Sequence, residues 1–228
     1  MAFAHLHAHT QYSILNGTCK IDDLLRAAEE QEMPALAITD TCNLYAAIRF
    51  YKAAKKSSVK AIYGSEIFLW PQGLDTLPHT KEDGGFHLAF LIENKQGYKN
   101  LSKLITTAIF DGMHYRPRID FNLLEKHSEG LIALTSGLNG PIGSSLFQAR
   151  SEEIARGNIQ RLAEIFGEDH LFLELQDFAI PEQIEMNHLT RNLASEFGLK
   201  TIEDSKNLNP VTFPNGELYF TSYDQEYV

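Results

Sequence analysis

The sequence predicts an α/β protein built on a parallel sheet or barrel, and three observations support this fold class. Short runs of β-branched or apolar residues alternate with longer stretches whose apolar residues recur at helical spacing. Strand and helix in this order favour parallel strands joined by crossovers. In such folds functional side chains collect at the carboxyl ends of strands, and Asp40 follows ALAIT while Glu66 follows AIYGS.

Each expected element follows from its own pattern. The first stretch, AFAHLHAHT, predicts a strand, and IDDLLRAAEEQEM predicts a helix with Leu24, Leu25 and Ala28 inward. ALAITD predicts the next strand. Helical spacing then returns at Leu44, Ala47, Ile48 and Tyr51. Further strands are expected at VKAIYGSEIFLW, FHLAFLIE, GLIALTS and HLFLELQ, with helices near 97–111, 151–166 and 181–196. The long polar stretch 71–85 is expected to be a loop.

Composition restricts the class of protein. At 228 residues and 43% hydrophobic content, the chain can bury a full core as one barrel-sized domain or two small ones. Cys19 and Cys42 give neither a disulfide framework nor a CxxC site, so we expect a reducing cytoplasm. With no signal-like or membrane-spanning stretch, we expect a protein that is neither exported nor inserted in a membrane. The net charge of −10 argues against independent DNA binding.

Three histidines stand at every second position near the start of the chain, in HLHAH. In a strand, His5, His7 and His9 would share one face, where two imidazoles can converge on one ion or on two neighbouring ions. A strand with three solvated or hydrogen-bonded histidines explains the row equally well. The row alone therefore leaves both interpretations open.

Other polar residues of metal-ligating type lie on the expected strands. Glu66 lies in YGSE, and His87 lies within the apolar FHLAFL. A lone histidine in an apolar strand is more often a satisfied core residue than a ligand. Together with His7 and His9, however, these residues form a nitrogen and carboxylate set suited to zinc or manganese.

Several long segments in the same order resemble the PHP (polymerase and histidinol phosphatase) domain at the N-terminus of bacterial DNA polymerase III alpha subunits. They are HLHAHTQYSILNG at 5–17, MPALAITDTCNL at 33–44, AIYGSEIFL at 61–69, FHLAFLIENKQGYKNL at 86–101, YRPRID at 115–120, EGLIAL at 129–134, FLELQDFAIPEQ at 172–183 and FPNGELYFTS at 213–222. The resemblance implies a distorted seven-stranded α/β barrel over 1–228, with a metal cleft at the strand ends.

The resemblance also implies site residues. The family's metal ligands fall on His7, His9, Glu66 and His87, and Asp40 matches the aspartate of its TDH motif, with His5 and Asp40 expected in the cleft. Active members hold up to three metal ions and activate water to cleave phosphoester bonds.

The chain departs from the family pattern at several ligand positions. Thr41 replaces a metal-binding histidine, Asn16 replaces an acidic residue, and Gly137 offers no side chain where a cysteine or histidine is common. After the helix expected to end near Phe197, the family continues with a strand carrying an NDxH motif, whereas this chain runs from GLKT directly into IEDSKNLNP. The sequence therefore leaves open whether this late strand is present, and if it is absent the barrel is expected to be open there.

Three functions are compatible with the resemblance. The first is a structural and docking domain of the polymerase subunit, with the rest of that subunit and the proofreading exonuclease subunit as partners, and DNA reached only through the parent holoenzyme. The second is an active metal-dependent phosphoesterase or 3′–5′ exonuclease, and the third is a free-standing histidinol-phosphatase-like enzyme. YRPRID and FPNGELYF favour the polymerase branch. The missing ligands favour the first function, with no required cofactor and at most one weakly bound zinc or manganese ion. The polymerase-like motifs predict that the chain is a fragment of a larger subunit and polymerises nothing alone.

Overall fold

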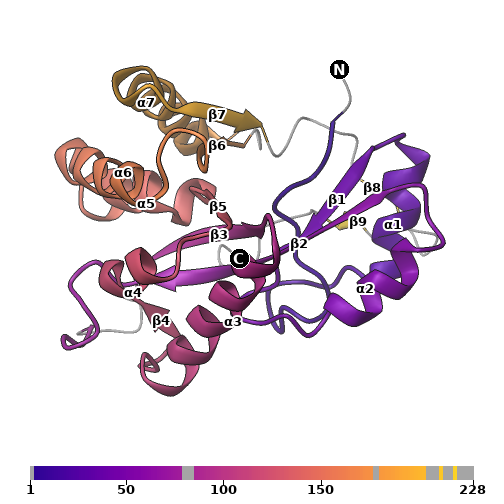
Figure 1. The fold of residues 1–228 in the computed structure, drawn as a ribbon. Helices are drawn as coiled ribbons and strands as arrows, with labels where there is room; N and C mark the ends of the chain where they lie inside the picture. The colour runs from indigo at the N-terminus through magenta and orange to yellow at the C-terminus, as the bar shows by residue number, and fades with distance from the viewer. Residues whose placement is uncertain (1–2, 79–84, 177–179, 204–210, 213–217, 220–228) are drawn as a thin grey trace.

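The computed structural model describes residues 3–78, 85–176, 180–203, 211–212 and 218–219. Figure 1 shows a strongly twisted sheet with helices along its outer side. The strands are β1 (Ala35–Ile38), β2 (Lys60–Leu69), β3 (Phe86–Ile92), β4 (Arg118–Ile119), β5 (Leu131–Leu134), β6 (Leu171–Leu175), β7 (Lys200–Glu203), β8 (Val211–Thr212) and β9 (Leu218–Tyr219). The helices are α1 (Ile21–Glu30), α2 (Ala47–Ala54), α3 (Lys95–Phe110), α4 (Phe121–Lys126), α5 (Pro141–Gly143), α6 (Glu152–Phe166) and α7 (Pro181–Phe197), with short turns η1 (Gly137–Asn139) and η2 (Ser144–Gln148).

The main sheet follows the order β1-β2-β3-β5-β6-β7, with β4 beside β2. This curled sheet confirms the predicted barrel-like α/β class. One part of the prediction is wrong, because β3 is antiparallel to both β2 and β5. The stretch between β2 and β3 contains no helix in its described residues, and a parallel neighbour requires a crossover, usually a helix. The other ladder pairs, β1 with β2, β2 with β4, β5 with β6 and β6 with β7, are parallel.

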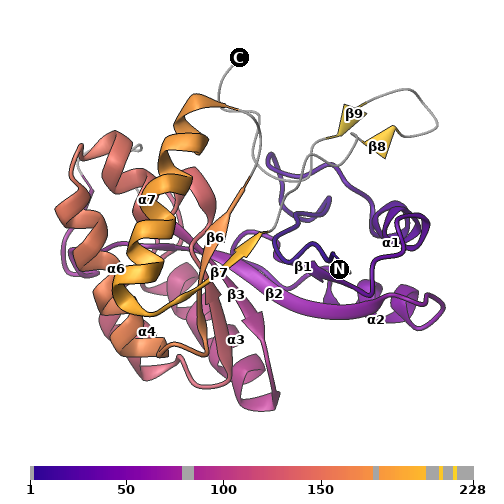
Figure 2. The same ribbon diagram turned by 90° about the horizontal axis from the view of Figure 1, so that it is seen from above.

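The strand that the sequence left in doubt is present. Residues 200–203 form β7, whose Ile202 pairs with Glu174 of β6. In Figure 2, α7 lies along the outside of β6 and β7. Residues 204–210 lie outside the described part of the chain, and among described strands β7 and β1 are the unjoined ends of the ladder. The described sheet is therefore a curled half-barrel that has its seventh strand.

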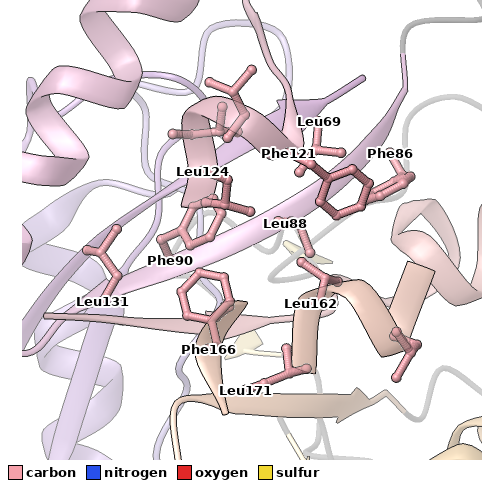
Figure 3. Close-up of a cluster of buried hydrophobic side chains, with 14 of the residues drawn as sticks. Leu69, Phe86, Leu88, Phe90, Phe121, Leu124, Leu131, Leu162, Phe166 and Leu171 are labelled. Atoms are coloured by element: carbon pink, nitrogen blue, oxygen red, sulfur yellow. The ribbon is translucent and has the colours of Figure 1, made fainter. Parts of the chain in front are cut away.

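The largest core lies between the outer face of the sheet and helices α3, α4, α6 and α7. Phe90 of β3 stacks on Phe166 of α6 with ring centroids 6.0 Å apart, and Leu131 and Leu171 flank this pair (Figure 3). A second core packs β1 against α1 and α2. A third, smaller cluster fills the opposite face of the sheet: Leu6, Ala37, Ile62, Ala89, Leu91, Ile132, Leu134, Phe172 and Ile202.

The predicted helices near 97–111, 151–166 and 181–196 are confirmed as α3, α6 and α7. The inward residues of α1 are also confirmed, since Leu24, Leu25 and Ala28 are buried. The apolar spacing at α2 is misleading, because Ile48 is 67% exposed whereas Phe50 is buried. None of the described helices has the length and hydropathy needed to cross a membrane.

Candidate metal site

The candidate site lies at one end of the sheet, on the face that carries the small inner cluster. Side chains alternate between faces along a strand, so Glu66 shares its face with Ile62 and His87 shares its face with Ala89. Glu66 lies late in β2, whereas His87 lies at the start of β3. Because β3 is antiparallel to β2, its beginning comes to the carboxyl end of its neighbour.

The N-terminal histidine segment lies beside β1 but is not the regular strand that the sequence predicts. His5 forms a single parallel bridge with Leu36, and Thr39 N–H donates to the Ala8 carbonyl at 2.8 Å. The segment thus follows the edge of β1. His7 and His9 are buried, whereas His5 is partly exposed with its ring packed edge-on against Phe3 at 5.0 Å.

His7, His9 and Glu66 bring their ligand atoms within 4.8 Å of one another. The Nε2 of His7 lies 3.4 Å from Glu66 Oε1, and the Nε2 of His9 lies 3.7 Å from Glu66 Oε2. His87 joins the same carboxylate, with Nδ1 at 3.0 Å from Oε1. Four of the six residues predicted for the cleft therefore lie together, because His7, His9 and His87 all face the Glu66 carboxylate.

Asp40 and His5 take other places. Asp40 is buried and accepts hydrogen bonds from Thr10 N–H at 2.7 Å, the Thr10 hydroxyl at 2.8 Å and the Ser13 hydroxyl at 2.6 Å. It therefore holds the loop after the histidine row and reaches the site through Ser13, whose oxygen lies 2.9 Å from His9 Nδ1. The bridge to β1 gives His5 a place at the sheet edge.

Sequence reasoning missed Glu174. It is fully buried on β6 and shares the inner face with Phe172. Both of its carboxylate oxygens lie 3.2 Å from His7 Nδ1. The available signal was an acidic residue inside the apolar strand FLEL, because a buried carboxylate requires polar partners.

Two of the departures from the family pattern lie at the site. The Thr41 hydroxyl lies 3.5 Å from Glu66 Oε2, beside the ligand set. A side chain at Gly137 would meet Gln176, because a Cβ there would lie 2.1 Å from its Oε1. Asn16, by contrast, is exposed in the turn that follows Ser13. A threonine hydroxyl therefore lies beside Glu66 and a glutamine amide lies beside Glu174. Neither group is a usual ligand of zinc.

The pKa values of His7 and His9 are shifted in opposite directions by their surroundings. Burial alone would lower the pKa of His7, but Glu174 and then Glu66 outweigh it and hold that pKa well above its ordinary value. Burial lowers the pKa of His9 despite the opposing charge of Glu66. Burial alone would raise the pKa of Glu66, but His87, His7 and His9 hold it well below its ordinary value. The two imidazoles that face the Glu66 carboxylate therefore have pKa values shifted in opposite directions.

The described residues fit one small divalent ion. Two imidazole nitrogens and a carboxylate are a ligand set that zinc or manganese accepts, and all three side chains are buried. An ion at these atoms would displace the proton of His7, since ligands coordinate in their deprotonated forms. The arrangement can therefore hold an ion, or hold itself together by ion pairs.

Comparisons with known proteins identify a family and several relatives. The PHP domain family matches residues 5–178. The DNA polymerase III alpha subunit of Treponema pallidum is 37% identical over 203 residues, covering 89% of this chain and 17% of the relative. The alpha subunit of Aquifex aeolicus is 39% identical over 218 residues, covering 91% of this chain and 18% of the relative. The chain thus spans less than a fifth of the length of these relatives.

Solved structures share the fold at low sequence identity. A candidate metal-dependent phosphoesterase from Bifidobacterium adolescentis superposes with a TM-score of 0.61 at 14% identity, covering 98% of this chain and 93% of that one. An amidohydrolase from Chromobacterium violaceum gives a TM-score of 0.57 at 11% identity, covering 90% of this chain and 87% of that one. The resemblance seen in the sequence, the half-barrel and the family match over 5–178 agree, and the chain belongs to the PHP domain family.

Proposed function

We propose that residues 1–228 are the PHP domain of a DNA polymerase III alpha subunit and act as a structural and docking domain rather than as a hydrolase. The 37–39% identity to alpha subunits supports this assignment. Polymerisation from deoxynucleoside triphosphates would belong to parts of the subunit that this chain does not span. The rest of the subunit is then the first partner, and DNA is contacted only through the assembled polymerase.

The ligand positions at Thr41 and Gly137 carry the non-catalytic part of the proposal. Water activation for phosphoester cleavage needs ions whose shells are completed by protein ligands, with a position left for substrate. Here a threonine hydroxyl stands beside Glu66, and the Gln176 amide fills the space at Gly137. Within the described part of the chain, a multi-ion centre therefore lacks ligands at these two positions.

What remains is proposed as a single-ion site without a catalytic role. His7, His9 and Glu66 would hold one zinc or manganese ion, and His87 would steady Glu66. A bound ion would supply positive charge between the N-terminal segment, which carries His7 and His9, and β2, which carries Glu66. Since the same side chains also pair with one another, the domain requires no cofactor to fold.

Exposed apolar side chains support the docking part. Ile14 and Leu15 are 80% and 89% exposed in the turn after the histidine row. The Asn43 amide donates to the Tyr12 carbonyl at 3.1 Å, which brings this turn beside the segment leading into α2, where Tyr45 is 70% exposed. Exposed apolar clusters of this kind mark protein interfaces. We assign this surface to a protein partner, with the proofreading exonuclease subunit as the proposed occupant.

Hydrolysis assays test the proposal. The chain, supplied with zinc or manganese at neutral pH, is incubated with p-nitrophenyl phosphate and with a 3′-labelled oligonucleotide, beside a His7→Ala, His9→Ala double variant. We expect the two proteins to give the same background. Activity in the parent that disappears in the double variant would instead establish a metal-dependent phosphoesterase or 3′–5′ exonuclease.

A further inference from the structure

Glu174 is a buried charged group that the sequence motifs leave unexplained. It lies in β6 between Leu173 and Leu175 and is 0% exposed. Burying a carboxylate in an apolar strand is costly unless hydrogen bonds and opposite charge compensate it. The groups around Glu174 therefore indicate what the residue is for.

Three groups converge on this carboxylate. Gln176 Nε2 donates to Oε1 at 2.5 Å, and Ser136 N–H donates to Oε2 at 3.0 Å. His7 Nδ1 lies 3.2 Å from each oxygen. Gln176, which follows β6, and Ser136, which follows β5, thus fix the orientation of the carboxylate. His7 contacts the same carboxylate from the N-terminal segment.

The contact determines which nitrogen His7 turns to the candidate ion. A carboxylate only accepts hydrogen bonds, so His7 Nδ1 carries the proton in this contact. The remaining nitrogen, Nε2, points to Glu66 Oε1 at 3.4 Å. Because Nδ1 keeps its proton for Glu174, Nε2 is the His7 nitrogen that would coordinate an ion.

His9 is arranged in the same way by different groups. Its Nδ1 lies 2.9 Å from the Ser13 oxygen, and the Ser13 hydroxyl donates to Asp40 at 2.6 Å. Because that hydroxyl proton is used on Asp40, His9 Nδ1 is the donor to Ser13. Both imidazoles therefore present Nε2 to Glu66, and the direct carboxylate contact to Nδ1 is found at His7.

We propose that Glu174 is the positioning residue of the metal site: it fixes the tautomer and ring orientation of His7 so that Nε2 faces the ion. This inference rests on the proposed single-ion site. Hydrogen bonds from a coordinating imidazole to a carboxylate raise its basicity as a ligand, and loss of such a partner costs about 10–100-fold in metal affinity. The contact also joins β6 to a segment 167 positions away in the sequence.

The test measures Co²⁺ binding by the parent chain, Glu174→Gln and Glu93→Gln. Glutamine keeps the size of Glu174 and removes its charge. Glu93 is the matched control, because it lies 3.7 Å from His170 Nε2 in a histidine–carboxylate pair on the surface. Titration of the visible absorption bands of bound Co²⁺ gives affinity and ligand geometry together. The His7 Nδ1 proton is followed by NMR in the metal-free proteins, including Glu174→Ala.

We expect Glu174→Gln to bind Co²⁺ about 10–100-fold more weakly with altered bands, and Glu93→Gln to match the parent. Equal affinity and equal bands in Glu174→Gln would overturn the inference. If the parent itself binds no Co²⁺, the single-ion proposal fails and the NMR result decides the role of Glu174. A slowly exchanging Nδ1 proton that disappears in Glu174→Ala then supports positioning of His7, and its absence from the parent rejects it.

Discussion

Asp40 shows how a residue near the site can serve the fold. It accepts three buried hydrogen bonds, two from Thr10 and one from Ser13. Asp40→Ala leaves all three donors without their acceptor, and each buried unsatisfied donor costs about 1–3 kcal/mol. We expect the free energy of unfolding to fall by about 3 kcal/mol or more in urea titrations. Asp169→Ala is the control, because Asp169 pairs with Lys200 on the surface, and a loss as large there would reject this explanation.

The two cysteines give a second prediction for single residues. Burial raises the pKa of Cys42 to about 12, and burial also raises the pKa of Cys19. The thiolate is the reactive form, so at pH 8 almost all Cys42 side chains are in the unreactive thiol form. We expect Ellman's reagent to modify neither thiol on native protein and both in guanidinium. Rapid labelling of the native chain at pH 8 would contradict the buried positions.

The candidate ligands and the residue that supports them differ in how visible they are in the sequence. His7 and His9 alternate near the start of the chain, and Glu66 and His87 lie in apolar strand patterns, so these four residue types indicate a shared candidate site. Glu174 has no such signature, because its partner His7 is 167 positions away and only the curl of the sheet joins them. Supports of this kind depend on tertiary contact and leave no local pattern.

Two helical glycines separate the effect of a close tertiary contact from the effect of helix propensity. Gly97 lies in the first turn of α3, where a Cβ would come within 1.8 Å of the Gly130 carbonyl oxygen. Gly157 lies within α6, where a Cβ would meet nothing within 4 Å. We expect Gly97→Ala to lower the free energy of unfolding by about 1–3 kcal/mol through overpacking. Gly157→Ala should raise it by roughly 0.5–1 kcal/mol, because alanine is the better helix former.

Denaturant titrations of both variants check this pair. The substitution is identical, so helix propensity alone would give the two variants the same sign. Opposite signs support the close approach of α3 to the loop at Gly130. Stabilisation by Gly97→Ala would show that this approach is not tight.

Periodicity in the sequence predicts whether a segment is a helix or a strand. It does not predict the direction of a strand in the sheet or which face of a helix is buried. The α3, α6 and α7 segments appear where helical spacing predicts them. The direction of β3 fits the described residues before it, which contain no crossover helix, and strand patterns alone do not report this. At α2, Ile48 and Tyr51 suggest an inward stripe, yet both are exposed, because Phe50 fills the core against β1. Tertiary packing therefore decides which apolar side chains of a helix are buried.

The curl of the whole sheet brings the residues of the candidate site together. Strand β6 brings Glu174 to the N-terminal segment, and β2 and β3 bring Glu66 and His87 to the same end. The half-barrel was predictable through the family resemblance. The presence of β7 was not, because GLKTIE is short and its strand is defined by pairing with β6.

The number of ions bound per chain distinguishes a single-ion site from a multi-ion centre. The chain is equilibrated with excess zinc, separated from free ions and weighed by native mass spectrometry, beside the His7→Ala, His9→Ala variant. We predict one ion per parent chain and none in the variant, because His7, His9 and Glu66 supply one ligand set. Two or three ions per parent chain would contradict a reduced site and restore the multi-ion centre needed for phosphoester cleavage. No bound ion at saturating zinc would contradict the single-ion site itself.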